Sequence, residues 1–220
     1  MYKKVAALFL SGVGLLAGSS GAVAADNLFK NYAYGTPMAS YATAKGYYDC
    51  SETVGKNSLC IDDVDFIGQK FTAALVFSGS KLIMVSLFAA FDQELFTNAI
   101  GALSKTFTMV AMADATSQLD LADTVAKSKD AADFTAKITN YESVGLNASN
   151  LTYIYIEGHP SFAGHKNMAS LLASVPDNVR SADLVIAGEG PEAAIVIRFS
   201  YPKLEANKVI QAKSKSVESF

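Results

Sequence analysis

Hydrophobic and polar residues alternate along residues 70–89, and this alternation predicts a β-hairpin. Every second residue from Phe71 to Phe77 is apolar, so these side chains would share one face of a strand. Gly79-Ser80 supplies a turn, after which the apolar run 82–89 returns beside the first strand. Shorter stretches of the same kind predict further strands at 47–50, 58–61, 64–67 and 108–112.

A helix is predicted after Asp92, because apolar residues recur there every three to four positions. Asp92 itself would cap the amino end of this helix. A second helix is predicted over 36–46, where Thr36-Pro37 gives a cap and a first turn, and a third over 161–175, which Pro176 would end. The periodic positions after Asp92 are Leu95, Phe96, Ala99, Ile100, Leu103 and Phe107.

The second half of the chain is organised in the same way. Residues 134–141 and 151–157 are predicted to be paired strands, joined across Gly145-Leu146-Asn147. Strands are also predicted at 182–187 and 193–201, on either side of a turn rich in Gly and Pro. Residues 117–129 fit either a polar helix or a mobile connection, and both interpretations stay open.

Hairpins separated by single helices predict an α+β protein rather than a doubly wound parallel sheet. We expect antiparallel sheets, each packed by one or two helices, in two similar halves. The predicted organisation is a signal peptide at 1–24, an N-terminal half at 25–113 that contains both cysteines, a connection at 114–133, a C-terminal half at 134–202, and a tail at 203–220 that starts helical after Pro202.

The first 24 residues have the pattern of a secretion signal. Lys3 and Lys4 form a short basic region, a twelve-residue apolar stretch follows, and Ala22-Val23-Ala24 supplies the small residues that signal peptidase needs. The apolar stretch is shorter than the roughly 20 residues of a membrane-spanning helix, so cleavage near Ala25 is favoured over a membrane anchor. Ser19 stands where a bacterial lipoprotein carries its lipidated cysteine. We therefore expect a periplasmic or secreted bacterial protein, with no transmembrane segment in its mature chain.

Cys50 and Cys60 are the only cysteines. In an oxidising compartment, a disulfide between two such neighbours is the default. Closing this short loop stabilises the fold by roughly 2.5–3 kcal/mol in the chain-entropy model. A metal or redox pair is the alternative, although nine intervening residues do not fit a C-x-x-C motif. We expect a structural disulfide.

Composition narrows the classes of function. The chain has 220 residues, of which 50% are hydrophobic and 18% charged, and its formal net charge is −3. A chain that is half apolar is not disordered throughout. Arginine occurs only at Arg180 and Arg198, which argues against a surface that binds nucleic acid.

No arrangement typical of a catalytic, metal or cofactor site stands out in the sequence. His159 and His165 are six residues apart, which does not match the i, i+4 spacing of a helical zinc pair. Ser78 to Lys81 matches S-x-x-K in letters but falls in the predicted hairpin turn. The carboxylates of Asp62, Asp63 and Asp65 lack the spacing of a calcium loop. We expect neither an enzyme nor a bound metal or cofactor.

Tyrosines gather at residues 32–48, which hold five of the ten in the chain. Tyrosine combines a large contact area with a polar tip, which suits recognition of a protein or a carbohydrate. The alternative is that these rings hold the predicted first helix against its sheet. Adjacent strand residues point to opposite faces, so one of Tyr47 and Tyr48 should pack inward, near Met38 and Tyr41, while the other is exposed. The candidate binding residues are Tyr32, Tyr34, Tyr47 and Tyr48.

Residues 35–89 contain three short motifs, one after another along the chain. Tyr34-Gly35-Thr36 opens the predicted first helix, Cys50 and Cys60 flank a turn, and Phe77 to Leu82 ends the first hairpin strand. In this order the motifs resemble one unit of the β-lactamase-inhibitor-protein and outer-membrane-assembly-lipoprotein type, over about a quarter of the chain. The resemblance implies an exported, non-catalytic unit that presents a sheet face to a protein partner. The second half lacks a second cysteine pair, so inhibition of a β-lactamase does not follow.

Three functions remain open on the sequence. The favoured one is a non-catalytic binding or interaction module of the cell envelope with a protein partner. The second is a carrier of a small apolar ligand between sheet and helices, which the 13 phenylalanines permit. The third is a hydrolase with a dispersed site, which would need His159 or His165 beside carboxylates such as Glu157 or Asp183.

Overall fold

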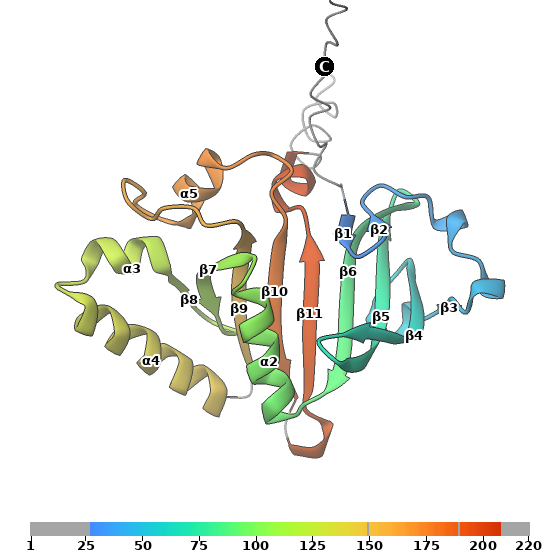
Figure 1. The fold of residues 1–220 in the computed structure, drawn as a ribbon, viewed down its shortest axis with the longest axis horizontal. Helices are drawn as coiled ribbons and strands as arrows, with labels where there is room; N and C mark the ends of the chain where they lie inside the picture. The colour runs from blue at the N-terminus through green and yellow to red at the C-terminus, as the bar shows by residue number, and fades with distance from the viewer. Residues whose placement is uncertain (1–26, 149, 189, 208–220) are drawn as a thin grey trace, which may run out of the picture.

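The computed structural model describes residues 27–148, 150–188 and 190–207. Its central feature is a nine-stranded antiparallel sheet, with a separate two-stranded sheet, β1-β2, beside it (Figure 1). The order of strands in the large sheet is β3-β4-β5-β6-β11-β10-β9-β7-β8. The strands are β1 (Asn27–Phe29), β2 (Tyr32–Ala33), β3 (Tyr48–Asp49), β4 (Ser58–Phe66), β5 (Gln69–Ser78), β6 (Lys81–Ala90), β7 (Phe107–Ala113), β8 (Gln118–Asp120), β9 (Asn150–Glu157), β10 (Ser181–Ala187) and β11 (Ala194–Ser200).

Helices of the described residues lie on both faces of this sheet and at one end of it, which confirms the predicted α+β class. Among the helices that the structure describes, none is long and apolar enough to cross a membrane. The α-helices are α1 (Ser51–Val54), α2 (Gln93–Leu103), α3 (Leu121–Lys127), α4 (Ala131–Asn147) and α5 (Met168–Ser174), and the 3-10 turns are η1 (Met38–Ser40), η2 (Thr43–Lys45) and η3 (Gly190–Glu192).

The main hydrophobic core lies on the sheet face that α2 covers, toward the viewer in Figure 1. Alternate residues of the central strands contribute to it, among them Leu75, Leu87 and Ile197, none of which has any exposed surface. From α2, the side chains that pack onto the sheet are Leu95, Phe96, Ala99 and Leu103.

Among the described residues, helices cover the opposite sheet face at its two flanks. On one flank, Val54 of α1 packs beside the two cysteines and Ala74 of β5. On the other flank, Leu171 of α5 packs against Ile156 of β9. Between the flanks, Met84 and Phe88 of β6, Val196 of β11 and Val185 of β10 stay partly exposed to solvent on this face, whereas Ser86 of β6 is buried.

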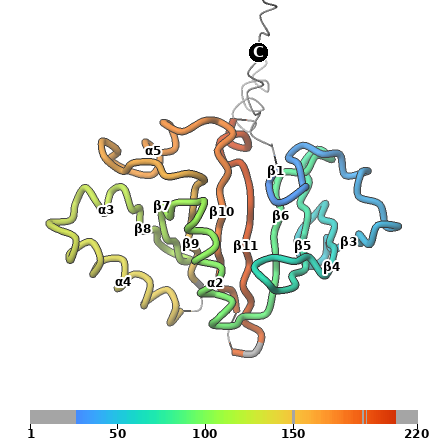
Figure 2. The backbone as a smooth tube through the Cα atoms, in the orientation of Figure 1, coloured from blue at the N-terminus to red at the C-terminus, as the bar shows by residue number. Residues whose placement is uncertain are grey.

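The two predicted halves share one sheet, which corrects the expectation of a sheet in each half. Strand β6 pairs with β11 through contacts such as Leu87 with Ile197, and the two strands lie side by side although they are far apart along the chain (Figure 2). The segment 114–133, which was expected to connect the halves, contains β8 and α3 and the start of α4.

Residues 134–141 are helical, so the prediction of a strand there is wrong. They belong to α4, whose cap Asp130 accepts a hydrogen bond from the Asp133 amide at 2.9 Å. Ile138 and Tyr141 lie on one side of this helix and pack against the main core, and Gly145, predicted as a turn, is buried within the helix. The β-branched residues of the segment favour a strand locally, and packing of one helical face overrides that preference.

Two other predicted helices are shorter than expected. Residues 36–46 form the separate turns η1 and η2, and Gly46 ends the second one in the left-handed region with φ +89°. Within 161–175, only α5 is helical, because Gly164 at φ +82° interrupts the chain and Asn167 provides the actual cap, accepting from the Ser170 amide at 2.8 Å.

Other predictions are confirmed by the structure. The hairpin β5-β6 turns at Gly79-Ser80, where both residues have positive φ as a type I′ turn requires. Asp92 caps α2 by accepting from the Leu95 amide at 2.8 Å. The strands predicted near 151–157, 182–187 and 193–201 are β9, β10 and β11, and residues 202–207 are helical. The predicted strands 58–61 and 64–67 are one strand, β4, with an irregularity between Ile61 and Val64.

The predicted signal peptide and its cleavage site near Ala25 lie outside the described residues. So does most of the predicted tail, from residue 208 onward.

Candidate binding surface

The predicted disulfide is confirmed. Cys50 and Cys60 are bonded, with a Cα–Cα distance of 5.8 Å. Cys60 lies on β4, and Cys50 links the end of β3 to the start of α1, so the bond holds α1 against the uncovered face of the sheet. Ser58, also buried on β4, donates from its hydroxyl to the Gly55 carbonyl at 2.8 Å and closes the same loop.

The four candidate tyrosines are divided between the core and the surface. Tyr32 is 7% exposed, and burial raises the pKa of its phenol. Tyr34 donates to Glu205 and packs edge-on against Tyr201. Tyr47 stacks against Tyr41, with 5.2 Å between the ring centroids. Tyr48 alone among the four is an exposed large hydrophobic residue, at 43%.

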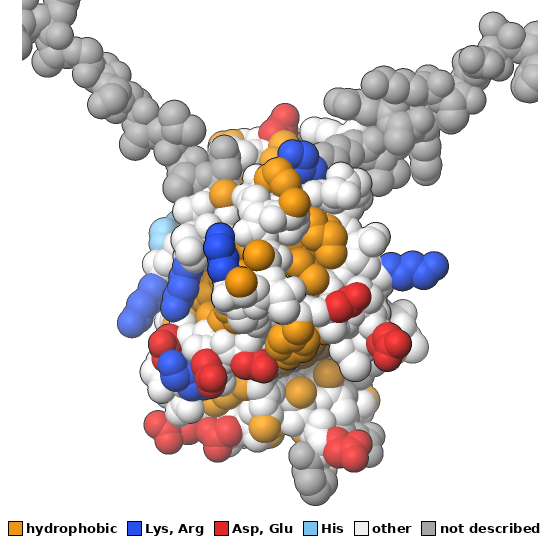
Figure 3. All heavy atoms as spheres, turned by 90° about the vertical axis from the view of Figure 1, so that its right-hand side faces the viewer, with side chains coloured by type: hydrophobic (Ala, Val, Ile, Leu, Met, Phe, Trp, Pro, Cys, Tyr) orange, Lys and Arg blue, Asp and Glu red, His pale blue; other side chains and the backbone are white. Residues whose placement is uncertain are grey.

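The expectation for Tyr47 and Tyr48 is confirmed, because Tyr47 packs against the main core and Tyr48 faces solvent. Tyr32, Tyr34 and Tyr47 thus pack the N-terminal segment against the sheet, as the alternative interpretation predicts. Seen from the β3 edge, hydrophobic side chains gather in the middle of the surface, with lysines and carboxylates around them (Figure 3). These placements favour Tyr48 as the binding candidate of the set.

Tyr48 is linked to the acidic part of β4. Its phenol donates to Asp62 Oδ1 at 3.0 Å, and the Thr72 hydroxyl donates to the same oxygen at 2.7 Å. Partial burial, together with the hydrogen bond to the Asp62 carboxylate, raises the pKa of Tyr48. The three side chains form a polar rim at the edge of the uncovered sheet face.

A groove of about 310 Å³ occupies the middle of this face. Its floor comes from three neighbouring strands in register: Phe88 of β6 is paired with Val196 of β11, which is paired with Val185 of β10. Because side chains alternate along a strand, these residues point away from the main core. The residues that line the groove are Thr53, Val54, Met84, Ser86, Phe88, Val185, Ala187, Val196 and Arg198.

An ion pair lies in the next row of the same floor. Arg198 Nη2 is 3.7 Å from Asp183 Oδ2, and the two residues are cross-strand partners. The Asp183 side chain is 30% exposed. Burial raises the pKa of its carboxyl, and the Arg198 charge offsets part of that effect. The cation on the floor is thus already matched by a carboxylate.

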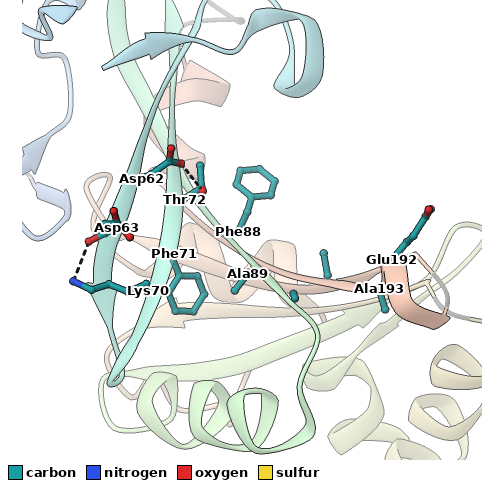
Figure 4. Close-up of a pocket in the computed structure, with 11 residues that line it drawn as sticks. Asp62, Asp63, Lys70, Phe71, Thr72, Phe88, Ala89, Glu192 and Ala193 are labelled. Atoms are coloured by element: carbon teal, nitrogen blue, oxygen red, sulfur yellow. Dashed lines mark hydrogen bonds between the residues drawn. The ribbon is translucent and has the colours of Figure 1, made fainter. Parts of the chain in front are cut away.

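A second groove, of about 490 Å³, lies between Phe88, the first residues of β5 and the turn that joins β10 to β11. Asp62, Asp63 and Lys70 stand on one side of it and Glu192 on the other, with Phe88 between them (Figure 4). Lys70 is paired with Asp65 at 2.7 Å.

A third hollow, of about 420 Å³, lies beside Tyr48 and α1 and is lined by residues 48–53. It shares Thr53 with the middle groove, and the middle groove shares Phe88 with the second one. The three hollows are thus neighbours on this part of the molecule, and we name them together the sheet-face groove.

The histidines do not join a group of carboxylates. His159 Nδ1 lies 3.3 Å from the Thr108 hydroxyl. Glu157 is paired with Arg180 at 2.6 Å, and that arginine also donates to the Asn27 and Leu28 carbonyls and so ties β1 to the sheet. Within residues 27–148, 150–188 and 190–207, no three His, Cys, Asp or Glu side chains lie close enough to hold a metal ion.

Two parts of the motif in residues 35–89 meet in space. Gly35 donates to the Leu82 carbonyl at 2.7 Å, and the Leu82 amide donates to the Thr36 carbonyl at 2.9 Å. Comparison with known proteins finds no family model, no curated protein and no solved structure that matches this chain. The resemblance to β-lactamase-inhibitor-type units thus stays a prediction.

The floor of the sheet-face groove was not among the sites predicted from the sequence. A signal was present, because the run 82–89 is apolar at nearly every position rather than at every second one. Such a run indicates a strand that buries both faces. On β6, one face is buried by the main core, while Met84 and Phe88 on the other face remain partly exposed.

Proposed function

We propose that the protein is an exported, non-catalytic binding module that recognises a protein partner through the sheet-face groove. The groove combines a partly exposed apolar floor with hydrogen-bonding groups at its rim, as binding sites do. Export is supported by the predicted signal sequence and by the disulfide.

The observation that carries this proposal is the uncovered centre of a sheet that is otherwise packed on both sides. Met84, Val185 and Val196 belong to none of the buried clusters, although α1 and α5 cover the flanks on either side of them. An apolar surface that is partly exposed and rimmed by polar residues is typical of an interaction site. A partner bound to the exposed centre of the sheet could also contact α1 and α5 at the two flanks.

The two alternative functions receive less support. A carrier of an apolar ligand needs a cavity that encloses most of its cargo, whereas the three hollows of the sheet-face groove open to solvent. A hydrolase of the kind considered above needs a histidine beside carboxylates, and the nearest polar side-chain contact of His159 is the Thr108 hydroxyl. Asp183 and Glu157 are each paired with an arginine instead.

Affinity capture with variants tests the proposal. The mature chain is immobilised and exposed to an envelope extract, and the retained proteins are identified by mass spectrometry. We expect one partner to be retained by the wild type and lost with Phe88→Ala and with Tyr48→Ala. Phe91→Ala is the matched control, because Phe91 is 36% exposed just beyond the same strand but does not line the groove.

Equal retention by all four proteins would place the binding surface elsewhere. Far-ultraviolet circular dichroism of each variant verifies that the fold is intact, so that a loss of capture reports on the surface and not on unfolding.

A further inference from the structure

The charges around the sheet-face groove define the chemistry of its partner. Its rim carries more carboxylates than cations on both sides of the apolar floor. We infer that the groove binds a cationic polypeptide segment, with apolar side chains on the floor and lysine or arginine side chains at the rim. This inference rests on the proposed function and names the partner class of that same site.

The first argument is the imbalance of charge. Five carboxylates line the groove, against two cations. Both cations are already paired: Lys70 with Asp65 at 2.7 Å and Arg198 with Asp183 at 3.7 Å. Within the part of the chain that the structure describes, the rim carboxylates form no ion pair, and their excess favours a negative potential in the groove. The five carboxylates are Asp49, Glu52, Asp62, Asp63 and Glu192.

The second argument is where the charges lie relative to the apolar floor. Asp63 of β4 and Glu192 of η3 stand on opposite sides of Phe88 (Figure 4). Asp49 and Glu52 line the hollow beside Tyr48. A segment that places apolar side chains on Phe88 and Val196 would thus bring its flanking residues close to carboxylates on both sides of Phe88. Cations there gain Coulomb energy, whereas carboxylates there would be repelled.

The third argument is the type of floor. It is built from strand side chains of β6, β11 and β10 and from Thr53 and Val54 of α1. The rings of Phe88, on this floor, and of Tyr48, in the neighbouring hollow, are large, rigid contacts of the kind that dominate binding energy in protein interfaces. A polypeptide supplies both the apolar and the cationic groups on one flexible chain.

Binding of synthetic peptides tests the inference. The probe is a soluble peptide in which leucine pairs alternate with lysines. One comparison peptide carries glutamate in place of each lysine, and a second carries serine in place of each leucine. Isothermal titration calorimetry with the mature chain should detect binding of the first peptide only. Raising the salt concentration should weaken that binding, because the rim charges are exposed and therefore screened.

A pair of charge-neutralised variants localises the effect. Asp63→Asn with Glu192→Gln should weaken binding of the leucine-lysine peptide about fivefold at low salt, since each exposed charge pair contributes modestly. Asparagine suits position 63, where φ is +60°. The matched control is Asp123→Asn with Glu94→Gln, which removes the same charges on α3 and α2, away from the groove, and should leave the affinity unchanged.

Two results would overturn the inference. One is equal or tighter binding of the glutamate peptide. The other is an equal loss of affinity in both double variants, which would show that the overall charge, and not the rim, governs binding. Neither result bears on the proposed function, which fails only if partner capture is insensitive to Phe88→Ala and Tyr48→Ala.

Discussion

Tyr47 and Tyr48 are chemically identical neighbours with different surroundings, since Tyr48 begins β3 and Tyr47 directly precedes it. Tyr47 packs against Tyr41 and its hydroxyl lies 3.4 Å from that of Tyr32, whereas Tyr48 is exposed and donates to Asp62. The inward ring contributes buried area to the fold, and the outward ring is available to a partner.

Substitution of these two tyrosines should have unequal effects on stability. Tyr47→Ala should lower the free energy of unfolding by about 2–3 kcal/mol, because it removes a packed ring from the aromatic cluster. Tyr48→Ala should change it by only about 0.5 kcal/mol, as at other surface positions. Urea unfolding measures both values. Tyr47→Phe keeps the ring and is the control for the hydroxyl. Equal losses for the two alanine variants would mean that the inward and outward roles are wrongly assigned.

The turn after β7 lowers the pKa of the Asp114 carboxyl. Its carboxylate accepts from the backbone amides of Thr116 and Ser117, both at 2.7 Å, and from the hydroxyls of the same residues. These hydrogen bonds favour the ionised form, so the pKa of Asp114 lies well below its ordinary value.

The acid side of the stability profile should depend on Asp114. The pKa of this carboxyl is lower in the folded chain than in the unfolded chain, so the ionised group stabilises the fold above about pH 4 and that contribution is lost as the pH falls further. Titration by nuclear magnetic resonance should show Asp114 ionised where ordinary aspartates are protonated. In Asp114→Asn the corresponding part of the acid destabilisation should be missing. A normal titration near the pKa of a free aspartate would contradict the assignment.

At the scale of elements, α4 shows how close packing can require glycine inside a helix. Gly145 is the only buried residue of this helix, and a Cβ atom at that position would lie 2.6 Å from Leu151 Cδ1 and 3.3 Å from Leu151 Cβ. Leu151 itself has no exposed surface. The glycine therefore lets α4 approach β9 closely.

Two Gly→Ala substitutions should have opposite effects. Gly145→Ala should destabilise the fold by about 1–2 kcal/mol, because overpacking outweighs the gain in helix propensity. Gly101→Ala in α2 should stabilise it by about 0.5–1 kcal/mol, because a Cβ atom there meets nothing within 4 Å. Thermal and urea unfolding of the two variants provide the measurement. A stabilised Gly145→Ala variant would show that Leu151 can move aside at little cost.

At the β3 edge of the sheet, a disulfide links α1 to β4. Reduction of Cys50–Cys60 should lower the free energy of unfolding by roughly 1–3 kcal/mol, since it releases a short loop. The fold should survive, because the main core lies on the other sheet face and does not include the cysteines. Unfolding curves with and without reductant, and of Cys50→Ser with Cys60→Ser, measure the difference. Loss of all structure on reduction would show that the bond is essential for folding.

On the scale of the whole molecule, strands from the N-terminal and C-terminal halves of the chain form one sheet. Strand β11 lies between β6 and β10, so the C-terminal strands complete the core that β5 and β6 begin. Leu87 and Ile197 pair directly across this junction. Neither half can bury its own sheet face without the other.

The molecule should therefore unfold in one cooperative step. Near-ultraviolet absorbance changes, which report on the packing of tyrosines in both halves, and far-ultraviolet circular dichroism, which reports on the backbone, should give coincident transitions in urea. Val85→Ala on β6 and Ile197→Val on β11 should shift both signals together. Two separate transitions would instead support two independently folding halves.

The sequence by itself determined those features that depend on local spacing. The turn at Gly79-Ser80, the start of α2 at Asp92 and the bond between Cys50 and Cys60 are all encoded within short stretches, because turn conformation, capping and loop closure act over a few residues. Alternation of adjacent residues also predicted that only one of Tyr47 and Tyr48 packs inward, although Tyr47 lies just before β3.

The tertiary structure alone decided the strand order and the groove. Pairing of β6 with β11 depends on residues remote in sequence, and no periodicity reports it. An apolar strand indicates that both faces can be buried, but only the assembled fold shows that the face with Phe88 and Val196 remains partly open. The helix α4 was missed for the same reason, because packing against the core outweighs the local preference of its β-branched residues.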